Sequence, residues 1–188
     1  MRLFVGIPLS EEIKFKLKPV YEQLRQTGGN FSFVLLENLH FTLAYLGEVA
    51  NLNAVVNPLQ EINFKPFLAD ARGLGSFGRP PKIIWVGSPG RELTELARLI
   101  REKLKFQIKD NQPYQPHLTL ARIKLLKDKN KLKKIISKYA DFTFGRMRVN
   151  RFILYGSKLT PKGPVYTVIR EFKAKISQNQ QRLNSFIS

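Results

Sequence analysis

The sequence predicts an α+β protein with antiparallel sheets, and three observations support this fold class. Segments with helical periodicity are interspersed along the chain with segments of strand character. The strand-like segments alternate apolar and polar residues, which favours antiparallel sheets with one open face over a doubly wound parallel sheet. No linker of low complexity divides the 188 residues, a length that suits one sizeable domain or two fused lobes.

The elements of the first half follow from local patterns. Residues 2–8 are predicted to form a strand, and Ser10 is placed to cap a helix that extends to Arg25. Gly28, Gly29 and the following Asn30 are predicted to end this helix. The other expected elements are an extended segment at 31–36, strands at 38–46, 66–74 and 82–86, and a helix at 51–62.

The second half repeats this alternation. Residues 91–106 have the clearest helical pattern, with leucine and isoleucine spaced along one face. A strand is expected at 117–123, a lysine-rich helix at 128–139, and strands at 142–155 and 166–174 around a turn at 161–164. The polar residues 177–188 are expected to form a tail outside a single domain of residues 1–176.

The composition restricts the chemistry that the chain can perform. The chain has no cysteine, which excludes disulfide scaffolds, thiolate zinc sites and a cysteine nucleophile. It has two histidines and no cluster of acidic residues at ligand spacing, so we expect neither a metal nor a cofactor. No segment has the apolar length of a signal peptide or of a membrane span, so a soluble, cytoplasmic protein is expected.

The formal net charge of +18 points to a polyanionic partner. A strongly positive field raises the local concentration of nucleic acid and speeds its encounter with the protein. The alternative is a lysine-rich surface that serves solubility or heat tolerance. The same two alternatives apply to the lysines of residues 124–138. They contact the backbone of an RNA, or they form the solvated face of a helix.

Both histidines of the chain lie in a repeated motif. The sequence is HFTLA at residues 40–44 and HLTLA at residues 117–121. From average residue frequencies, threonine and leucine would follow both histidines at these offsets by chance about once in a hundred thousand sequences. Because side chains alternate along a strand, His40 and Thr42 should share one face, as should His117 and Thr119. Two such strands, related by an approximate two-fold axis, would place two His/Thr pairs across one cleft.

This arrangement suits the displacement of a phosphodiester without a metal. One imidazole can take a proton from the attacking water or hydroxyl, while the other gives a proton to the leaving oxygen. Histidine suits both tasks because its unperturbed pKa lies near 6.5, so both protonation states are accessible near neutrality. The hydroxyls of Thr42 and Thr119 can donate to the non-bridging oxygens. The motifs alone do not determine which histidine is the acid.

The two HxTx motifs resemble those of the two-histidine phosphoesterase superfamily, and within it the LigT-like 2′-5′ RNA ligases, also called RNA 2′,3′-cyclic phosphodiesterases. The resemblance extends over nearly the whole chain. It includes RLFVGI at 2–7, ENL at 37–39, GLGSFG at 73–78 with Ile84 and Trp85, Pro116 and Arg122, and GPVY at 163–166. The chain departs from the pattern at Gly78, where relatives often carry proline, and this departure affects no catalytic residue.

The resemblance implies a bilobal fold, each lobe an antiparallel sheet with outer helices, and an active site in the groove between the lobes. It implies hydrolysis of RNA 2′,3′-cyclic phosphate ends to 2′-phosphomonoesters, and reversible 2′-5′ ligation without ATP. His40 would be the proton donor and His117 the proton acceptor, and Thr42, Thr119 and Arg122 would bind the substrate. The implied partners are RNA ends, tRNA fragments among them, and we expect a monomer.

Three further features leave alternatives open. Strand alternation places Arg122 on the face of Leu118, unless a bulge or the strand end turns its guanidinium towards a phosphate. Trp85, Tyr114, Phe41 and Tyr45 are candidates for base stacking or for the core. The segment 73–78 spells GxGxxG, yet prolines and a predicted strand follow it, so we expect a glycine-rich turn between strands and no dinucleotide site.

Two other functions remain as alternatives. One is a two-histidine phosphodiesterase that acts on small cyclic nucleotides or 2′-5′ oligonucleotides. The other is a non-catalytic RNA-binding module. Substrate length and salt dependence separate the first from an RNA-end enzyme, and replacement of His40 or His117 separates an enzyme from a binding module.

Overall fold

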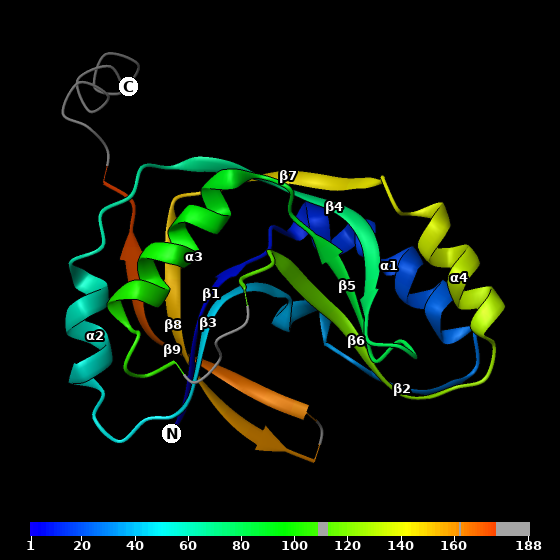
Figure 1. The fold of residues 1–188 in the computed structure, drawn as a ribbon, viewed down its shortest axis with the longest axis horizontal. Helices are drawn as coiled ribbons and strands as arrows, with labels where there is room; N and C mark the ends of the chain where they lie inside the picture. The colour runs from blue at the N-terminus through cyan, green and yellow to red at the C-terminus, as the bar shows by residue number, and fades with distance from the viewer. Residues whose placement is uncertain (109–112, 162, 176–188) are drawn as a thin grey trace.

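The computed structural model describes residues 1–108, 113–161 and 163–175, and it confirms the predicted α+β class with two antiparallel sheets (Figure 1). One sheet, here called sheet A, has the strand order β3-β1-β8-β9, and the other, sheet B, has the order β2-β6-β5-β4-β7. Every strand pair in both sheets is antiparallel. The predicted turn at Lys162 and the predicted tail at 177–188 include residues outside the described part.

Most elements occur where the sequence predicts them. The strands are β1 (Arg2–Pro8), β2 (Gly29–Phe33), β3 (His40–Glu48), β4 (Phe67–Phe77), β5 (Ile83–Gly87), β6 (His117–Leu126), β7 (Thr143–Val149), β8 (Arg151–Thr160) and β9 (Gly163–Lys173). The helices are α1 (Glu11–Arg25), α2 (Asn53–Gln60), α3 (Arg91–Lys103) and α4 (Lys129–Lys138), and a short 3-10 helix spans Leu36–Asn38. Ser10 caps α1 as predicted, and its hydroxyl accepts from the Ile13 amide at 3.5 Å.

One predicted strand is wrong. Residues 142–155 do not form a single strand, because β7 ends at Val149 and β8 begins at Arg151. β7 pairs with β4 in sheet B, whereas β8 pairs with β1 and β9 in sheet A. The chain therefore crosses from one sheet to the other at Asn150. Two successive polar residues, Asn150 and Arg151, interrupt the apolar alternation at this crossing, but the interruption does not show that the chain changes sheets.

The glycine-rich segment also differs from its prediction. Gly73 and Gly75 lie inside β4, and the turn to β5 begins only at Gly78. Gly73 has a φ of 76°, which glycine adopts without strain, at an irregularity in the β4–β5 pairing. Gly75 has no room for a side chain, since a Cβ there would overlap the Trp85 ring. The strand β5, and not a helix, comes directly after this turn, and this order does not fit a dinucleotide-binding segment.

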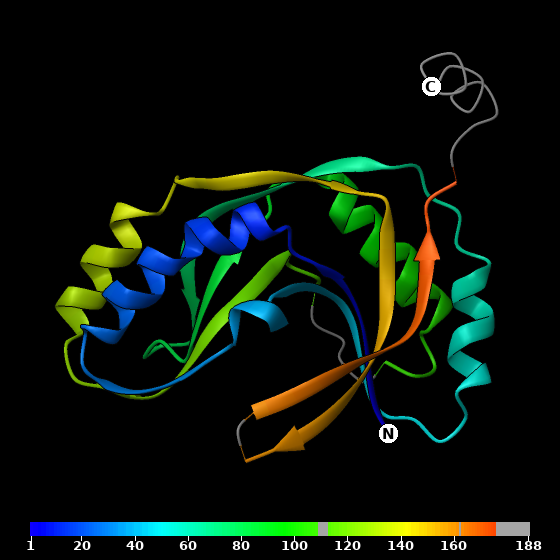
Figure 2. The same cartoon turned by 180° about the vertical axis from the view of Figure 1, so that it is seen from behind.

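The helices cover the outer faces of the two sheets. α2 and α3 pack beside sheet A, whereas α1 and α4 pack beside sheet B (Figures 1 and 2). The apolar faces of these helices and the inner positions of the strands form one connected core. β3 and β6 contact each other where the two sheets meet, so the two repeated motifs lie side by side. This meeting point positions the candidate site.

Candidate active site

The side chains of both motifs alternate as the sequence predicts. In β3, Phe41 and Leu43 are buried in the core, while His40 and Thr42 are partly exposed. In β6, Leu118 and Leu120 are likewise buried, and His117 and Thr119 are partly exposed. The apolar pair of each motif anchors its strand, and the histidine and threonine are left on the open face.

A β-bulge follows the threonine of each motif. In the β5–β6 pairing, Ile84 is opposite Ala121 and Trp85 is opposite Thr119, so Leu120 is an extra residue. In the β1–β3 pairing, Val5 is opposite Ala44 and Gly6 is opposite Thr42. An extra residue shifts the alternation of the strand by one position beyond the bulge. Each bulge therefore makes two successive residues buried, and it returns the next residue to the open face.

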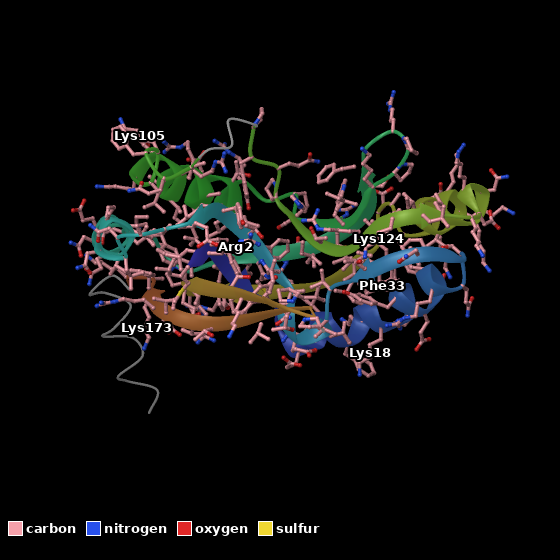
Figure 3. The ribbon with its side chains drawn as sticks, turned by 90° about the horizontal axis from the view of Figure 1, so that it is seen from below. Arg2, Lys18, Phe33, Lys105, Lys124 and Lys173 are labelled. Atoms are coloured by element: carbon pink, nitrogen blue, oxygen red, sulfur yellow. The ribbon has the colours of Figure 1, made fainter. Side chains whose placement is uncertain are left out.

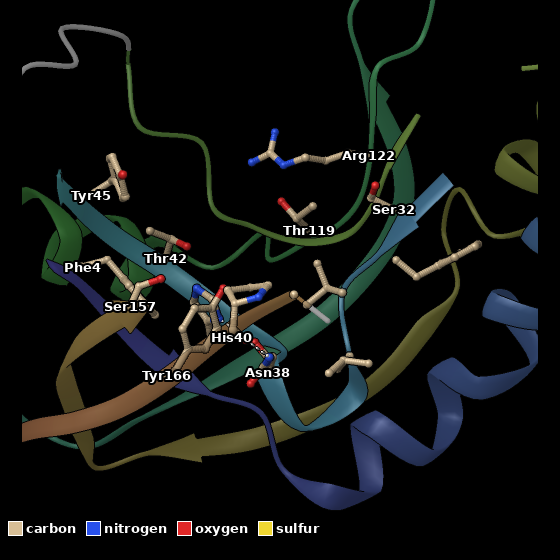
Figure 4. Close-up of a pocket in the computed structure, with 15 residues that line it drawn as sticks. Phe4, Ser32, Asn38, His40, Thr42, Tyr45, Thr119, Arg122, Ser157 and Tyr166 are labelled. Atoms are coloured by element: carbon tan, nitrogen blue, oxygen red, sulfur yellow. Dashed lines mark hydrogen bonds between the residues drawn. The ribbon is translucent and has the colours of Figure 1, made fainter. Parts of the chain in front are cut away.

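The residues after the two bulges are Arg122 and Tyr45. Both are exposed, and both line the same cavity as His40, Thr42 and Thr119. The sequence predicts that Arg122 faces a phosphate only if the strand has a bulge, and β6 has this bulge. In Figure 4, the guanidinium of Arg122 extends over Thr119 towards the side of the cavity where Tyr45 and Thr42 lie.

The two imidazoles are held in the same way. His40 Nδ1 lies 2.7 Å from the carbonyl oxygen of Asn38, and His117 Nδ1 lies 2.8 Å from that of Gln115. A carbonyl oxygen only accepts, so Nδ1 carries the hydrogen in each ring. The other nitrogen, Nε2, is then left to exchange protons with a ligand. In both motifs, the residue two positions before the histidine fixes the tautomer.

The surroundings of the two imidazoles differ. The ring of Phe4 stacks on His40 at a centroid distance of 4.6 Å, and the ring of Tyr166 meets it edge-on at 5.4 Å. Tyr155 also stacks on Phe4 at 4.9 Å, and its ring lies 6.3 Å from that of His40. His117 has an edge-on contact with Phe77 at 5.0 Å. His40 is therefore surrounded by aromatic rings from β1, β8 and β9.

This environment disfavours a charge on His40. Burial lowers the pKa of His40 below its ordinary value of 6.5. The hydrogen bond to the Asn38 carbonyl opposes this effect, and the charge of His117 lowers the pKa further. Burial also raises the pKa of Tyr166, while the nearby charge of Arg122 lowers it in part. In the free protein His40 is consequently neutral at pH 7.

The cavity encloses about 330 Å³ and has a polar side and an apolar side. His40, Thr42, Thr119, Arg122 and Ser32 are among the lining residues whose polar groups Figure 4 shows. The remaining lining residues come from the segment before His40, from β1 and β3, and from the β8–β9 hairpin: Phe4, Phe33, Val34, Leu35, Asn38, Tyr45, Ser157, Gly163, Pro164 and Tyr166. The Asn38 amide donates to the Pro164 carbonyl at 3.0 Å and so joins this hairpin to the segment before His40.

Four of the five predicted site residues line the cavity. His117 is not among its lining residues, although it lies close enough for its charge to affect His40. Ser32, Ser157 and Tyr166 line it without having been predicted as site residues. Ser32 lies opposite Arg122 in the β2–β6 pairing, and no sequence pattern marks it. Tyr166 belongs to the GPVY segment, which the family resemblance includes without a role.

The four aromatic residues that are candidates for base stacking differ in their positions. Phe41 is a core residue, and Tyr114 packs against the core. Trp85 covers Gly75 and contacts Phe77 at 5.1 Å. Tyr45 is 56% exposed and lines the cavity. Among the four, Tyr45 is therefore the one available to a ligand.

The residues that the structure describes include no metal-binding cluster and no membrane-spanning helix. In that part of the chain, no three His, Asp or Glu side chains are grouped so that they could hold a metal ion. No described helix has the length and apolar character to cross a membrane.

Comparisons with known proteins agree on one family. Residues 16–159 match the model of the 2′-5′ RNA ligase superfamily. The RNA 2′,3′-cyclic phosphodiesterase of Archaeoglobus fulgidus is 38% identical over 92% of this chain and 100% of its own length. The structure of TT0787 from Thermus thermophilus superposes with a TM-score of 0.80 at 28% identity, covering 95% of this chain and all of that one. The apo form of Escherichia coli LigT superposes with a TM-score of 0.76 at 26% identity, over 93% of this chain and 98% of its own.

Proposed function

Because the chain belongs to the 2′-5′ RNA ligase superfamily, we propose that it is a hydrolase that opens 2′,3′-cyclic phosphates at RNA ends. The observation that carries this proposal is the pair of imidazoles held alike through Nδ1, on adjoining strands. A relative of similar length bears the name RNA 2′,3′-cyclic phosphodiesterase, which supports the same substrate.

The proposed reaction is an in-line displacement at phosphorus. A water molecule attacks the cyclic phosphate, and His117 Nε2 takes its proton as the P–O bond forms. The bond from phosphorus to O3′ breaks, and His40 Nε2 gives O3′ a proton. The products are a 2′-phosphomonoester and a free 3′-hydroxyl. The family resemblance supplies this assignment of acid and base, because the two motifs hold their histidines alike.

We propose that three polar side chains bind the phosphate oxygens. The hydroxyls of Thr42 and Thr119 lie on the same strand faces as the two histidines. Arg122 supplies a planar cation that can donate two parallel hydrogen bonds to the non-bridging oxygens. These donors favour the transition state because negative charge accumulates on the oxygens as water attacks.

His40 needs a proton before it can act as the donor. In the free protein, burial and the charge of His117 lower its pKa, so the imidazole is neutral near pH 7. The cyclic phosphate carries one negative charge, and a negative charge beside an imidazole favours the protonated form. We infer that His40 takes up its proton as the substrate binds.

The same groups account for a ligase reaction. When the 5′-hydroxyl of a second RNA replaces water, the same two proton transfers join the RNAs through a 2′-5′ phosphodiester. No ATP is needed, because the new ester bond from phosphorus to O5′ replaces the bond from phosphorus to O3′ that breaks, and the opening of the strained ring favours this exchange. RNA ends, including those of tRNA fragments, are the proposed partners, and we propose that the protein acts as a cytoplasmic monomer.

The proposal is tested with an oligoribonucleotide that ends in a 2′,3′-cyclic phosphate, incubated with the protein in EDTA. Phosphorus NMR distinguishes a 2′-phosphomonoester from its 3′ isomer. The 2′ isomer is expected. Formation of the 3′ isomer would contradict the assignment of O3′ as the leaving group, and an unchanged substrate would contradict the hydrolase.

A further inference from the structure

The residues that orient the two imidazoles differ in what their side chains do. Asn38 and Gln115 occupy equivalent positions, and the backbone carbonyl of each accepts from Nδ1 of its histidine. Gln115 is exposed, whereas Asn38 is partly buried and its side-chain amide donates to the Pro164 carbonyl at 3.0 Å. Through its backbone and its side chain together, Asn38 therefore connects His40 to a segment 126 positions later in the sequence.

Asn38 is itself fixed by the backbone around it. It is the last residue of the 3-10 helix Leu36–Asn38, and its backbone N–H donates to the Leu35 carbonyl at 2.9 Å. The next residue, Leu39, is buried in the core directly before β3 begins. The side chain of Asn38 thus extends from a point that is held on both sides. Its bond to Pro164 can therefore hold the other partner in place.

The end of the β8–β9 hairpin needs a contact of this kind. β8 pairs with β1 only as far as Ser157, which lies opposite Arg2. β9 is an edge strand of sheet A, with β8 as its neighbour in the sheet. The hairpin consequently extends beyond the rest of the sheet, as Figures 1 and 2 show. Pro164, opposite Leu159, lies in this extension, and Asn38 donates to it there.

The same part of the hairpin places an aromatic ring against His40. Tyr166 comes two residues after Pro164 and lies opposite Ser157 in the β8–β9 pairing. Its ring meets the His40 ring edge-on at 5.4 Å and the Phe4 ring at 4.9 Å. Figure 4 shows Asn38, His40 and Tyr166 together at the cavity. Release of the hairpin end would free this ring to move away and would admit water to the imidazole.

We propose that Asn38 is a positioning residue for His40, which holds the hairpin end and the Tyr166 ring against the imidazole that its own carbonyl orients. This assignment rests on the proposed function, in which His40 is the proton donor. A misplacement of about 1 Å in a catalytic site can cost on the order of 100-fold in rate. Loss of one hydrogen bond is milder and corresponds to roughly 2- to 10-fold.

Asn38→Ala should lower kcat for a cyclic-phosphate RNA roughly 2- to 10-fold, with KM within about twofold, because the phosphate-binding groups are unchanged. Proton NMR should show the pKa of His40 rising towards 6.5 as water reaches its ring. The variant keeps His117 and the carbonyl of residue 38, so this rise reports the loss of the surrounding ring. Asn38→Asp keeps the shape of the side chain without the donor, and its kcat should fall at least as far.

A double variant tests whether Asn38 acts through Tyr166. Tyr166→Leu removes the ring, and in that background Asn38→Ala should lower kcat by less than about twofold further. Gln107→Ala is the matched control, since Gln107 Nε2 also donates to a distant backbone carbonyl, that of Ala54 at 3.2 Å, outside the cavity. It should leave both kcat and the pKa of His40 unchanged.

An unmoved His40 resonance in Asn38→Ala, or a loss that appears in KM alone, would overturn the assignment of Asn38. Losses that multiply in the double variant, or an equal effect of Gln107→Ala, would overturn it as well. The NMR measurement needs no turnover, so it tests the role of Asn38 separately from the proposed function. If the unchanged protein leaves the cyclic-phosphate RNA intact, the proposed function fails, whatever the resonance shows.

Discussion

At the scale of single residues, the two histidines share a motif and differ in their surroundings. Each donates from Nδ1 to the carbonyl two residues earlier. His40, however, is packed between Phe4 and Tyr166, whereas His117 contacts Phe77. The surroundings, and not the motif, therefore lower the pKa of His40 in the free protein. Sequence comparison of the two motifs cannot reveal this difference.

Proton NMR of the free protein should show His40 titrating below pH 6.5, because burial and the charge of His117 disfavour its imidazolium form. The chain has two histidines, so a His117→Gln variant identifies the His40 resonance. Since the folded pKa is depressed, the unfolded chain binds more protons, and stability should fall as the pH drops below about 6.5.

Phe4→Leu should raise the pKa of His40 towards 6.5, because a smaller side chain admits water to the face of the imidazole. A His40 resonance that titrates at or above 6.5 in the unchanged protein would contradict the effect of burial. An unmoved resonance in Phe4→Leu would show that Phe4 does not contribute to it.

At the scale of elements, the two bulges determine which side chains line the site. The sequence predicts that histidine and threonine share a face, and the structure confirms it. The adjacent buried pairs, Leu43 with Ala44 and Leu120 with Ala121, were the available sign of an irregular strand. Regular alternation would have buried Arg122 or turned it away, so its place depends on one extra residue in β6.

Local sequence patterns determine some of these elements, and contacts between distant segments determine others. Helix α1 and its Ser10 cap follow from local chemistry, and the structure has them as predicted. The break at Asn150 depends on which distant strand each half pairs with, β4 or β1. Ser32 likewise joins the cavity only through the β2–β6 pairing. Contacts between segments far apart in the chain decide these features, and local patterns do not encode them.

Asp128→Ala should destabilise the protein by about 1 kcal/mol without changing its activity. Asp128 Oδ1 accepts from the Lys131 amide at 2.8 Å at the start of α4, and loss of such a cap costs roughly 0.5–2 kcal/mol. Thermal unfolding measures the change, and Asp128→Asn is the control that keeps an acceptor. Equal losses in the two variants would indicate that the cap is not the cause.

At the scale of the whole molecule, the chain crosses repeatedly between the sheets. β1, β3, β8 and β9 form sheet A, while the strands between β3 and β8 and the separate β2 form sheet B. The two motifs therefore come together only when both sheets are complete. The formal net charge of the chain is +18, and the exposed lysines of α4 lie beside sheet B.

Replacing Lys129, Lys133 and Lys134 with glutamine should flatten the salt dependence of RNA binding. All three are exposed on α4, and each lysine that contacts a single-stranded phosphate contributes about 0.7 to the slope of log K against log salt. Replacing Lys65, Lys173 and Lys175 gives a control of equal charge, and Figure 3 shows Lys173 far from Lys124. An unchanged slope in the α4 variant would remove this helix from the RNA-binding surface.

In the proposed mechanism, His40 and His117 exchange protons with a cyclic phosphate. Its most direct test is kcat for the cyclic-phosphate RNA in His40→Ala, His117→Ala and the double variant, together with RNA affinity. Each single change should lower kcat by about 10²- to 10⁴-fold while RNA binding is retained. Because the two histidines act as one unit, the double variant should lose much less than the product of the single losses. Full activity in either single variant would contradict the mechanism.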